Sequence, residues 1–250
     1  MRLELKKGVD ILSDLGAITS MDGARKCFQT KCNEENLVKI GRIVHEEALL
    51  KIANAIAMLR PDSVWINSGS RGDRESARAM ALNSGEEFQL KLDRHTCHYD
   101  LPEDQGRLVN QTFHIVNEDE NISVLAKKML RSEAHAYVRD VMAGAMEGKT
   151  MLLSFWNRGP VGAAPAVPAI MISDSYYVVH SGNILYPNVF EHFDAEAKRA
   201  GVFFTNIHTM GTFRSEDIHK ARIFMDRSWQ TTYSMYCTYA GNTLMLKKGN

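Results

Sequence analysis

The chain has 250 residues, enough for one large domain or two small ones with a hydrophobic core. Lys and Arg total 30, as do Asp and Glu, so the net charge is zero and no general affinity for nucleic acid or anionic membranes is expected. No apolar run approaches the roughly 20 residues that span a bilayer, and the start lacks the apolar region of a signal peptide. The four cysteines fit no zinc spacing. With neither a signal peptide nor a membrane span expected, a cytoplasmic protein with reduced thiols is predicted.

The first half of the chain mixes helical and extended patterns. Residues 1–33 have mixed character and are expected to form an N-terminal arm, with residues 34–250 as the main domain. Apolar residues recur every three to five positions over 34–60, which predicts one long helix with Asn33 as its N-cap and Pro61 at its end. A buried strand, a turn, a short helix, another strand and a longer helix are then expected. Their ranges are 63–67, 68–73, 75–83, 108–116 and 122–146.

The second half is richer in strand signals. Strands are predicted over 151–156, 169–173 and 176–181, a helix over 190–200, and extended segments at VFFTNIHTMG and ARIFM. These elements do not follow the strict alternation of a doubly wound sheet. The predicted fold class is therefore α/β, as a mixed α+β domain around one sheet.

One segment imitates a phosphate-binding loop. AGAMEGKT, at residues 143–150, has Ala where the first Gly of such a loop belongs. A helix is predicted before it and a strand after it, which is the reverse of the order that aims backbone N–H groups and a helix N-terminus at phosphates. A helix-to-strand turn is the favoured interpretation.

Three other segments leave alternatives open. His95 and His98, with Cys97 and Asp100, could ligate a metal, although a single HxxH in a polar segment favours a solvated loop. The loop at 158–168, rich in Gly and Pro, could let backbone approach a ligand or merely join two strands. The tail YAGNTLMLKK could bind a carboxylate through backbone N–H groups, or be an ordinary basic C-terminus.

Four motifs in order decide between these alternatives. They are PDSVWINSGS (61–70), LPEDQGRLVNQTFHIV (101–116), GKTMLLSFWNRGPVGAAP (148–165, followed by DSYYVV) and YAGNTLMLKK (239–248). Together they resemble the GTP-type phosphoenolpyruvate carboxykinases over residues 50–248, and imply the N-terminal domain of such an enzyme. The variants YAG and GAAP lean toward the pyrophosphate-dependent branch.

The resemblance implies conversion of oxaloacetate to phosphoenolpyruvate and CO2, with Mn²⁺, Mg²⁺ and a phosphoryl donor, GTP or pyrophosphate. Arg107 matches the arginine that binds the substrate carboxylate, for which a planar guanidinium is suited. Tyr239 matches the catalytic-site tyrosine over the bound substrate, with Ala240 and Gly241 giving backbone contacts beside it.

Two lysines complete the implied site. Lys247 matches a catalytic lysine near the transferring phosphoryl group. Lys248 matches a metal ligand that binds as a neutral amine, which requires a lowered pKa that a bound dication would cause.

Only Gly249 and Asn250 follow these lysines, whereas the family's remaining metal ligands and nucleotide pocket lie further along. We expect the oxaloacetate- or phosphoenolpyruvate-binding part of a gluconeogenic or anaplerotic lyase, holding no metal or nucleotide by itself. A separate C-terminal kinase-domain chain could complete it in a split enzyme. The alternatives are a non-catalytic carboxylate-binding or regulatory relative and a purely structural subunit, which would have no need of a free guanidinium at Arg107.

Overall fold

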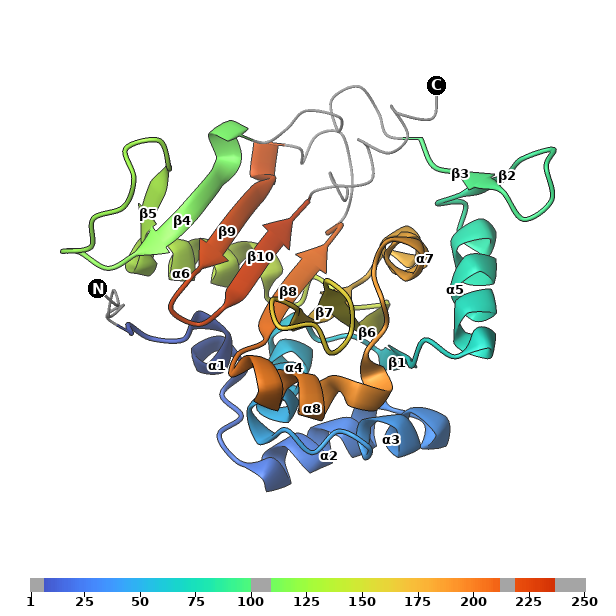
Figure 1. Ribbon diagram of the computed structural model, residues 1–250. Helices are drawn as coiled ribbons and strands as arrows, with labels where there is room; N and C mark the ends of the chain where they lie inside the picture. The colour runs from blue at the N-terminus through green and yellow to red at the C-terminus, as the bar shows by residue number, and fades with distance from the viewer. Residues whose placement is uncertain (1–6, 100–108, 212–218, 237–250) are drawn as a thin grey trace.

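The computed structural model describes residues 7–99, 109–211 and 219–236, and is built around one mixed sheet of eight strands (Figure 1). In spatial order the strands are β1 (Ser63–Asn67), β6 (Thr150–Arg158), β7 (Val167–Ser173), β8 (Phe204–Thr209), β10 (Thr231–Met235), β9 (Arg222–Asp226), β4 (Thr112–Val116) and β5 (Lys128–Leu130). A separate pair consists of β2 (Phe88–Gln89) and β3 (Thr96–Cys97). The predicted mixed α/β class is confirmed.

Strand direction divides the sheet into two sets. β1, β6, β9, β4 and β5 run one way, whereas β7, β8 and β10 run the other way. We call the end where β8 and β10 terminate and β9 and β4 begin the upper end, as it is drawn in Figure 1. The chain therefore enters β9 and β4, and leaves β8 and β10, at this same upper end.

Helices cover both faces of the sheet. The larger core lies under α1 (Ile11–Gly16), α2 (Met21–Lys31), α3 (Glu34–Ile40), α4 (Glu46–Leu59), α6 (Arg131–Met142) and α8 (Phe193–Ala200). The other face carries α5 (Arg71–Asn83) and α7 (Tyr176–Leu185). Side chains of β6 alternate accordingly: Leu153 and Phe155 enter the larger core, while Leu152 packs against Ala77 and Val179. β6 is thus buried on both faces.

The predicted helix over 34–60 is wrong in its middle. Asn33 caps the first turn as predicted, but α3 ends at Ile40. The carboxylate of Asp194 accepts hydrogen bonds from the backbone N–H groups of Val44 and His45, at 3.1 and 2.9 Å, so the chain turns before α4 begins. A contact distant in sequence therefore interrupts a continuous helical pattern.

The predicted strand over 176–181 is helix α7. Ser175 caps it, and the Glu86 carboxylate accepts hydrogen bonds from the N–H groups of Tyr176 and Tyr177, at 3.1 and 3.0 Å. A carboxylate at a helix N-terminus satisfies N–H groups that have no partner in the helix and complements the helix dipole. This contact outweighs the strand preference of the Tyr and Val residues.

Three other boundaries differ from those predicted. The helix expected over 122–146 is confined to α6, and residues 128–130 form β5 instead, while Val124 and Leu125 are exposed. α5 begins at Arg71 because Ser70 caps it, so residues 71–73 belong to a helix and not to a turn. The strand expected from 108 begins at Thr112, after a 3-10 turn (Val109–Gln111). β10 was not anticipated.

The N-terminal helices share the main core. Ile11 and Leu12 of α1 and Phe28 of α2 are buried in the same cluster as the residues of α4. The division at residue 33 stays a prediction about the domain boundary. No helix within the described ranges has both the length and the apolar character needed to cross a membrane.

A buried ion pair ties the start of the chain to the far side of the sheet. Arg131 binds the Asp226 carboxylate through two nitrogens, at 2.5 and 3.1 Å, and donates to the Val9 carbonyl oxygen at 3.0 Å. The Asp226 side chain is fully buried. Such a carboxylate depends on its cation, since burial removes the water that would otherwise solvate it.

Replacing Arg131 by Met should lower the free energy of unfolding by about 3–5 kcal/mol, because it strands the Asp226 charge. Urea denaturation followed by circular dichroism measures this. The control is Arg139→Met, which removes an exposed cation paired only with its neighbour Asp140 and should change stability by less than about 0.5 kcal/mol. Equal effects of the two substitutions would contradict this account of the pair.

Candidate functional site

The segments that carry the predicted site residues join the described structure at the upper end of the sheet. Arg107 precedes β4, which begins at Thr112, and Tyr239 follows β10, which ends at Met235. Thr112 pairs with Ile223 of β9, which pairs with Ser234 of β10. Because adjacent strands lie about 4.8 Å apart, the two strands are separated by roughly 10 Å at this end.

The predicted residues themselves fall outside the described ranges. These are Arg107, Tyr239, Ala240, Gly241, Lys247 and Lys248. The described residues give the frame from which both segments extend.

A buried carboxylate organises this end of the sheet. Asp174, directly after β7, has a fully buried side chain. It accepts hydrogen bonds from Lys149 Nζ at 2.6 Å, Thr209 Oγ1 at 2.9 Å and the Met210 backbone N–H at 2.8 Å. Lys149 Nζ also donates to the Gly211 carbonyl oxygen at 2.6 Å. The start of β6, the end of β7 and the end of β8 are thereby fixed to one another.

Gly211 then meets the end of β10. Its backbone has a left-handed conformation (φ 56°), and a Cβ there would overlap the Tyr236 ring, lying 2.9 Å from Cδ1 and closer to Cε1 and Cζ. Tyr236 donates its backbone N–H to the Thr209 carbonyl oxygen at 2.9 Å. Only glycine therefore fits at position 211 without moving the ring.

The segment that imitates a phosphate-binding loop lies between α6 and β6, in the predicted order of helix then strand. Its lysine, Lys149, is held by Asp174 and Gly211. The surroundings of a phosphate cradle, a strand before and a helix N-terminus after, are absent around this described segment.

The histidines of the β2–β3 hairpin contact other groups of the protein. His98 stacks on Tyr177 with ring centroids 3.7 Å apart, and His95 Nδ1 lies 2.9 Å from the Asp93 carbonyl oxygen. Asp100 is outside the described residues. Within the described parts of the chain, no three His, Cys, Asp or Glu side chains gather as a metal site.

The loop at 158–168 joins β6 and β7 as an antiparallel connection at the lower end of the sheet. Helix α8 holds it: Glu196 accepts the Gly162 N–H at 3.1 Å, and Arg199 donates to the carbonyl oxygens of Ala164 and Ala166. The Arg199 guanidinium beside Glu196 keeps the pKa of that carboxyl below its ordinary value. These contacts favour the connecting role over the approach to a ligand.

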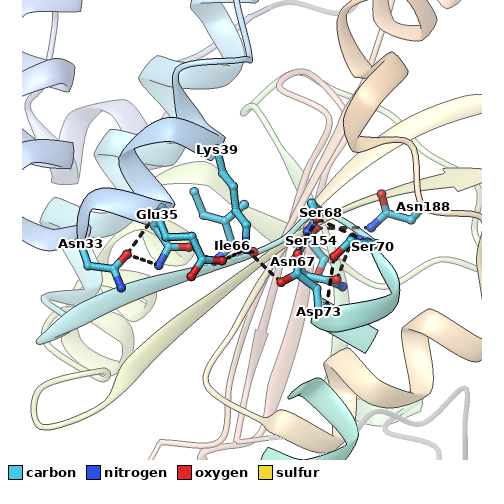
Figure 2. A network of polar contacts seen from close by, with 12 residues as sticks. Asn33, Glu35, Lys39, Ile66, Asn67, Ser68, Ser70, Asp73, Ser154 and Asn188 are labelled. Atoms are coloured by element: carbon cyan, nitrogen blue, oxygen red, sulfur yellow. Dashed lines mark hydrogen bonds and ion pairs between the residues drawn. The ribbon is translucent and has the colours of Figure 1, made fainter. Parts of the chain in front are cut away.

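The serine–glycine turn after β1, residues 68–70, lies at the lower end as well, because β1 runs parallel to β6 and ends there. Figure 2 shows the polar contacts around it. Asn67 is fully buried and donates to Ser154 Oγ at 3.1 Å, while Asp73 accepts from Lys39 Nζ at 2.9 Å and from Ser68. Burial alone would raise the pKa of Asp73, but the hydrogen bonds from Ser68 and Lys39 outweigh burial and lower it. This network joins α3, β1 and α5, and it fixes the fold at the end opposite the candidate site.

Comparison with known proteins gives the lineage. The sequence model of the phosphoenolpyruvate carboxykinase N-terminal domain matches residues 51–250. The chain belongs to the phosphoenolpyruvate carboxykinase family. It is 35% identical over 216 residues to the GTP phosphoenolpyruvate carboxykinase of Saccharolobus solfataricus, covering 86% of this chain and 34% of the relative. The Pyrococcus furiosus enzyme of the same name is 33% identical over 235 residues, covering 91% and 37%.

The carboxykinase chain therefore spans about a third of the length of these curated relatives. Sequence analysis found the family motifs, including the DS of DSYYVV that contains Asp174. It did not find the role of Asp174 as the partner of Lys149, nor the contact between Gly211 and Tyr236. In the sequence, GKT lies at the predicted start of one strand and DS at the end of another, and this was the available signal for the pair. Only the order of strands in the sheet reveals that the start of β6 and the end of β7 lie side by side.

Replacing Lys149 by Met should destabilise this carboxykinase domain by about 1.5–3 kcal/mol, the range for hydrogen bonds to charged groups, because Asp174 loses its cation. Thermal and urea unfolding measure the loss. Lys198→Met, on the exposed side of α8, is the matched control and should change stability by less than about 0.5 kcal/mol. A silent Lys149→Met would show that Asp174 is satisfied without the lysine.

Proposed function

We propose that this chain supplies the oxaloacetate- or phosphoenolpyruvate-binding part of a carboxykinase, with Arg107 and Tyr239 meeting at the upper end of the sheet. One observation carries the proposal: β4 begins and β10 ends at the same end, with only β9 between them. The few residues from Thr112 back to Arg107, and from Met235 on to Tyr239, reach farther than the roughly 10 Å between the two strands.

The proposed chemistry of binding follows from residue type. The Arg107 guanidinium offers two parallel N–H donors to one carboxylate of the substrate. Tyr239 covers the substrate, while the backbone N–H groups of Ala240 and Gly241 donate to its anionic oxygens. Lys247 adds positive charge where the phosphoryl group of phosphoenolpyruvate would lie.

In a complete carboxykinase, Mn²⁺ and Mg²⁺ would stabilise the enolate formed on decarboxylation, and Lys248 would be one ligand. One lysine is not a ligand set, and the described residues contain no group that fits a metal. The proposal for this chain is therefore confined to substrate binding. The relatives named as GTP enzymes support GTP as the donor of a complete protein, whereas YAG and GAAP favour pyrophosphate.

Oxalate, a dicarboxylate of similar charge, should bind with a Kd near millimolar, or about 4 kcal/mol. Arg107→Lys should weaken it by roughly 1–2 kcal/mol although the charge is kept, since an ammonium lacks the planar pair of donors. Calorimetry or NMR titration measures both. Arg25→Lys, at an exposed position of α2, is the control and should leave the affinity unchanged. Equal affinity of wild type and Arg107→Lys would contradict the proposed site.

The purified chain should form no phosphoenolpyruvate from oxaloacetate with GTP, ATP or pyrophosphate, because phosphoryl transfer requires donor and metals to be held together. An assay coupled to phosphoenolpyruvate release, with Mn²⁺ and Mg²⁺ present, measures this. Added phosphoenolpyruvate verifies the detection. Donor-dependent product formation by the pure chain would overturn the idea that it is only the substrate-binding part, and would identify the donor.

A further inference from the structure

Tyr236, the last described residue before the motif YAGNTLMLKK, has an unusual backbone conformation. Tyr236 directly follows β10 with φ 53°, in the left-handed region that residues other than glycine rarely enter. Such a conformation is strained for a residue with a side chain and persists only where surrounding contacts hold it. Tyr239 is three positions further along the sequence.

Two contacts hold Tyr236 in that conformation. Its N–H is bound by the Thr209 carbonyl oxygen at 2.9 Å, which continues the pairing of β10 with β8. Its ring lies against the bare Cα of Gly211, while the ammonium of Lys220 is 5.7 Å from the ring centroid. Position 236 is thus fixed by both its backbone and its ring.

Gly211 is in turn fixed by charged groups. Its carbonyl oxygen accepts from Lys149, and its neighbour Met210 donates to Asp174. Gly211 N–H also donates to Thr209 Oγ1 at 3.0 Å. The ion pair between Lys149 and the buried Asp174 therefore sets where the glycine presents its open face to the Tyr236 ring.

From this arrangement we infer that Gly211 and Tyr236 are positioning residues, whose contact fixes the backbone at the end of β10, three positions before Tyr239 in the sequence. The inference rests on the proposed function, because Tyr239 is the residue being positioned. A methyl group at 211 would displace the Tyr236 ring, and with it the backbone of residue 236 from which the proposed site segment continues.

A double-mutant cycle tests the contact. Gly211→Ala should weaken oxalate binding at least tenfold and Tyr236→Ala about threefold. The double variant should bind like Tyr236→Ala, because the added methyl no longer meets a ring. Gly201→Ala is the matched control: it has the same left-handed backbone (φ 65°) with no atom within 4 Å of the added Cβ, and it should leave binding unchanged. An undiminished Gly211→Ala effect in the Tyr236→Ala background would overturn the inference.

A second pair of variants covers failure of Gly211→Ala to fold. Tyr236→Phe keeps the ring and should bind oxalate within twofold of wild type, whereas Tyr236→Ala should not. Equal binding by these two variants would contradict the role of the ring.

A measurement without ligand separates this inference from the proposed function. Fluorotyrosine labelling with ¹⁹F NMR reports on Tyr239, whose signal is assigned by its loss in Tyr239→Phe. Gly211→Ala should shift that signal, and Gly201→Ala should not. If the wild type fails to bind oxalate but the signal shifts, the positioning contact stands and the proposed function falls. An unchanged Tyr239 signal in Gly211→Ala overturns the positioning role whatever oxalate does.

Discussion

The upper end of the sheet depends on the buried carboxylate of Asp174. A fully buried charge requires a cation and hydrogen-bond donors close by, and the chain supplies them from Lys149, Thr209 and the Met210 backbone. These donors come from residues before β6 and at the end of β8, so one charge connects three strands. The geometry of these strand ends follows from satisfying that charge.

Strand direction explains why the two segments of the proposed site join the sheet at the same end. β9 lies between β4 and β10, parallel to the first and antiparallel to the second. The start of β4 and the end of β10, which come from opposite halves of the sequence, therefore lie at one end of the sheet. At the lower end, by contrast, contacts from α3 hold the serine–glycine turn and contacts from α8 hold the loop at 158–168. These contacts give both segments a role in stabilising the fold.

Local signals predicted structure well where the neighbouring residues decide it. Asn33 caps α3, and Gly201 closes α8 in the left-handed conformation, because each acts on backbone groups within one turn. Prediction failed where a distant side chain decides: Asp194 breaks the helix between α3 and α4, and Glu86 makes a helix of YYVVHS. The proposed site residues Arg107 and Tyr239 came from family motifs, and no local pattern would have paired them.

The sequence by itself determined the family, the mixed α/β class and the rejection of a phosphate loop at AGAMEGKT, since these rest on ordered motifs and on the succession of helix and strand. Only the tertiary structure decided that Lys149 serves Asp174, that Gly211 seats the Tyr236 ring, and that β4 and β10 share one end. The physical reason is that buried charges and ring contacts select partners by distance in space, whereas helix caps and turns select them by distance along the chain.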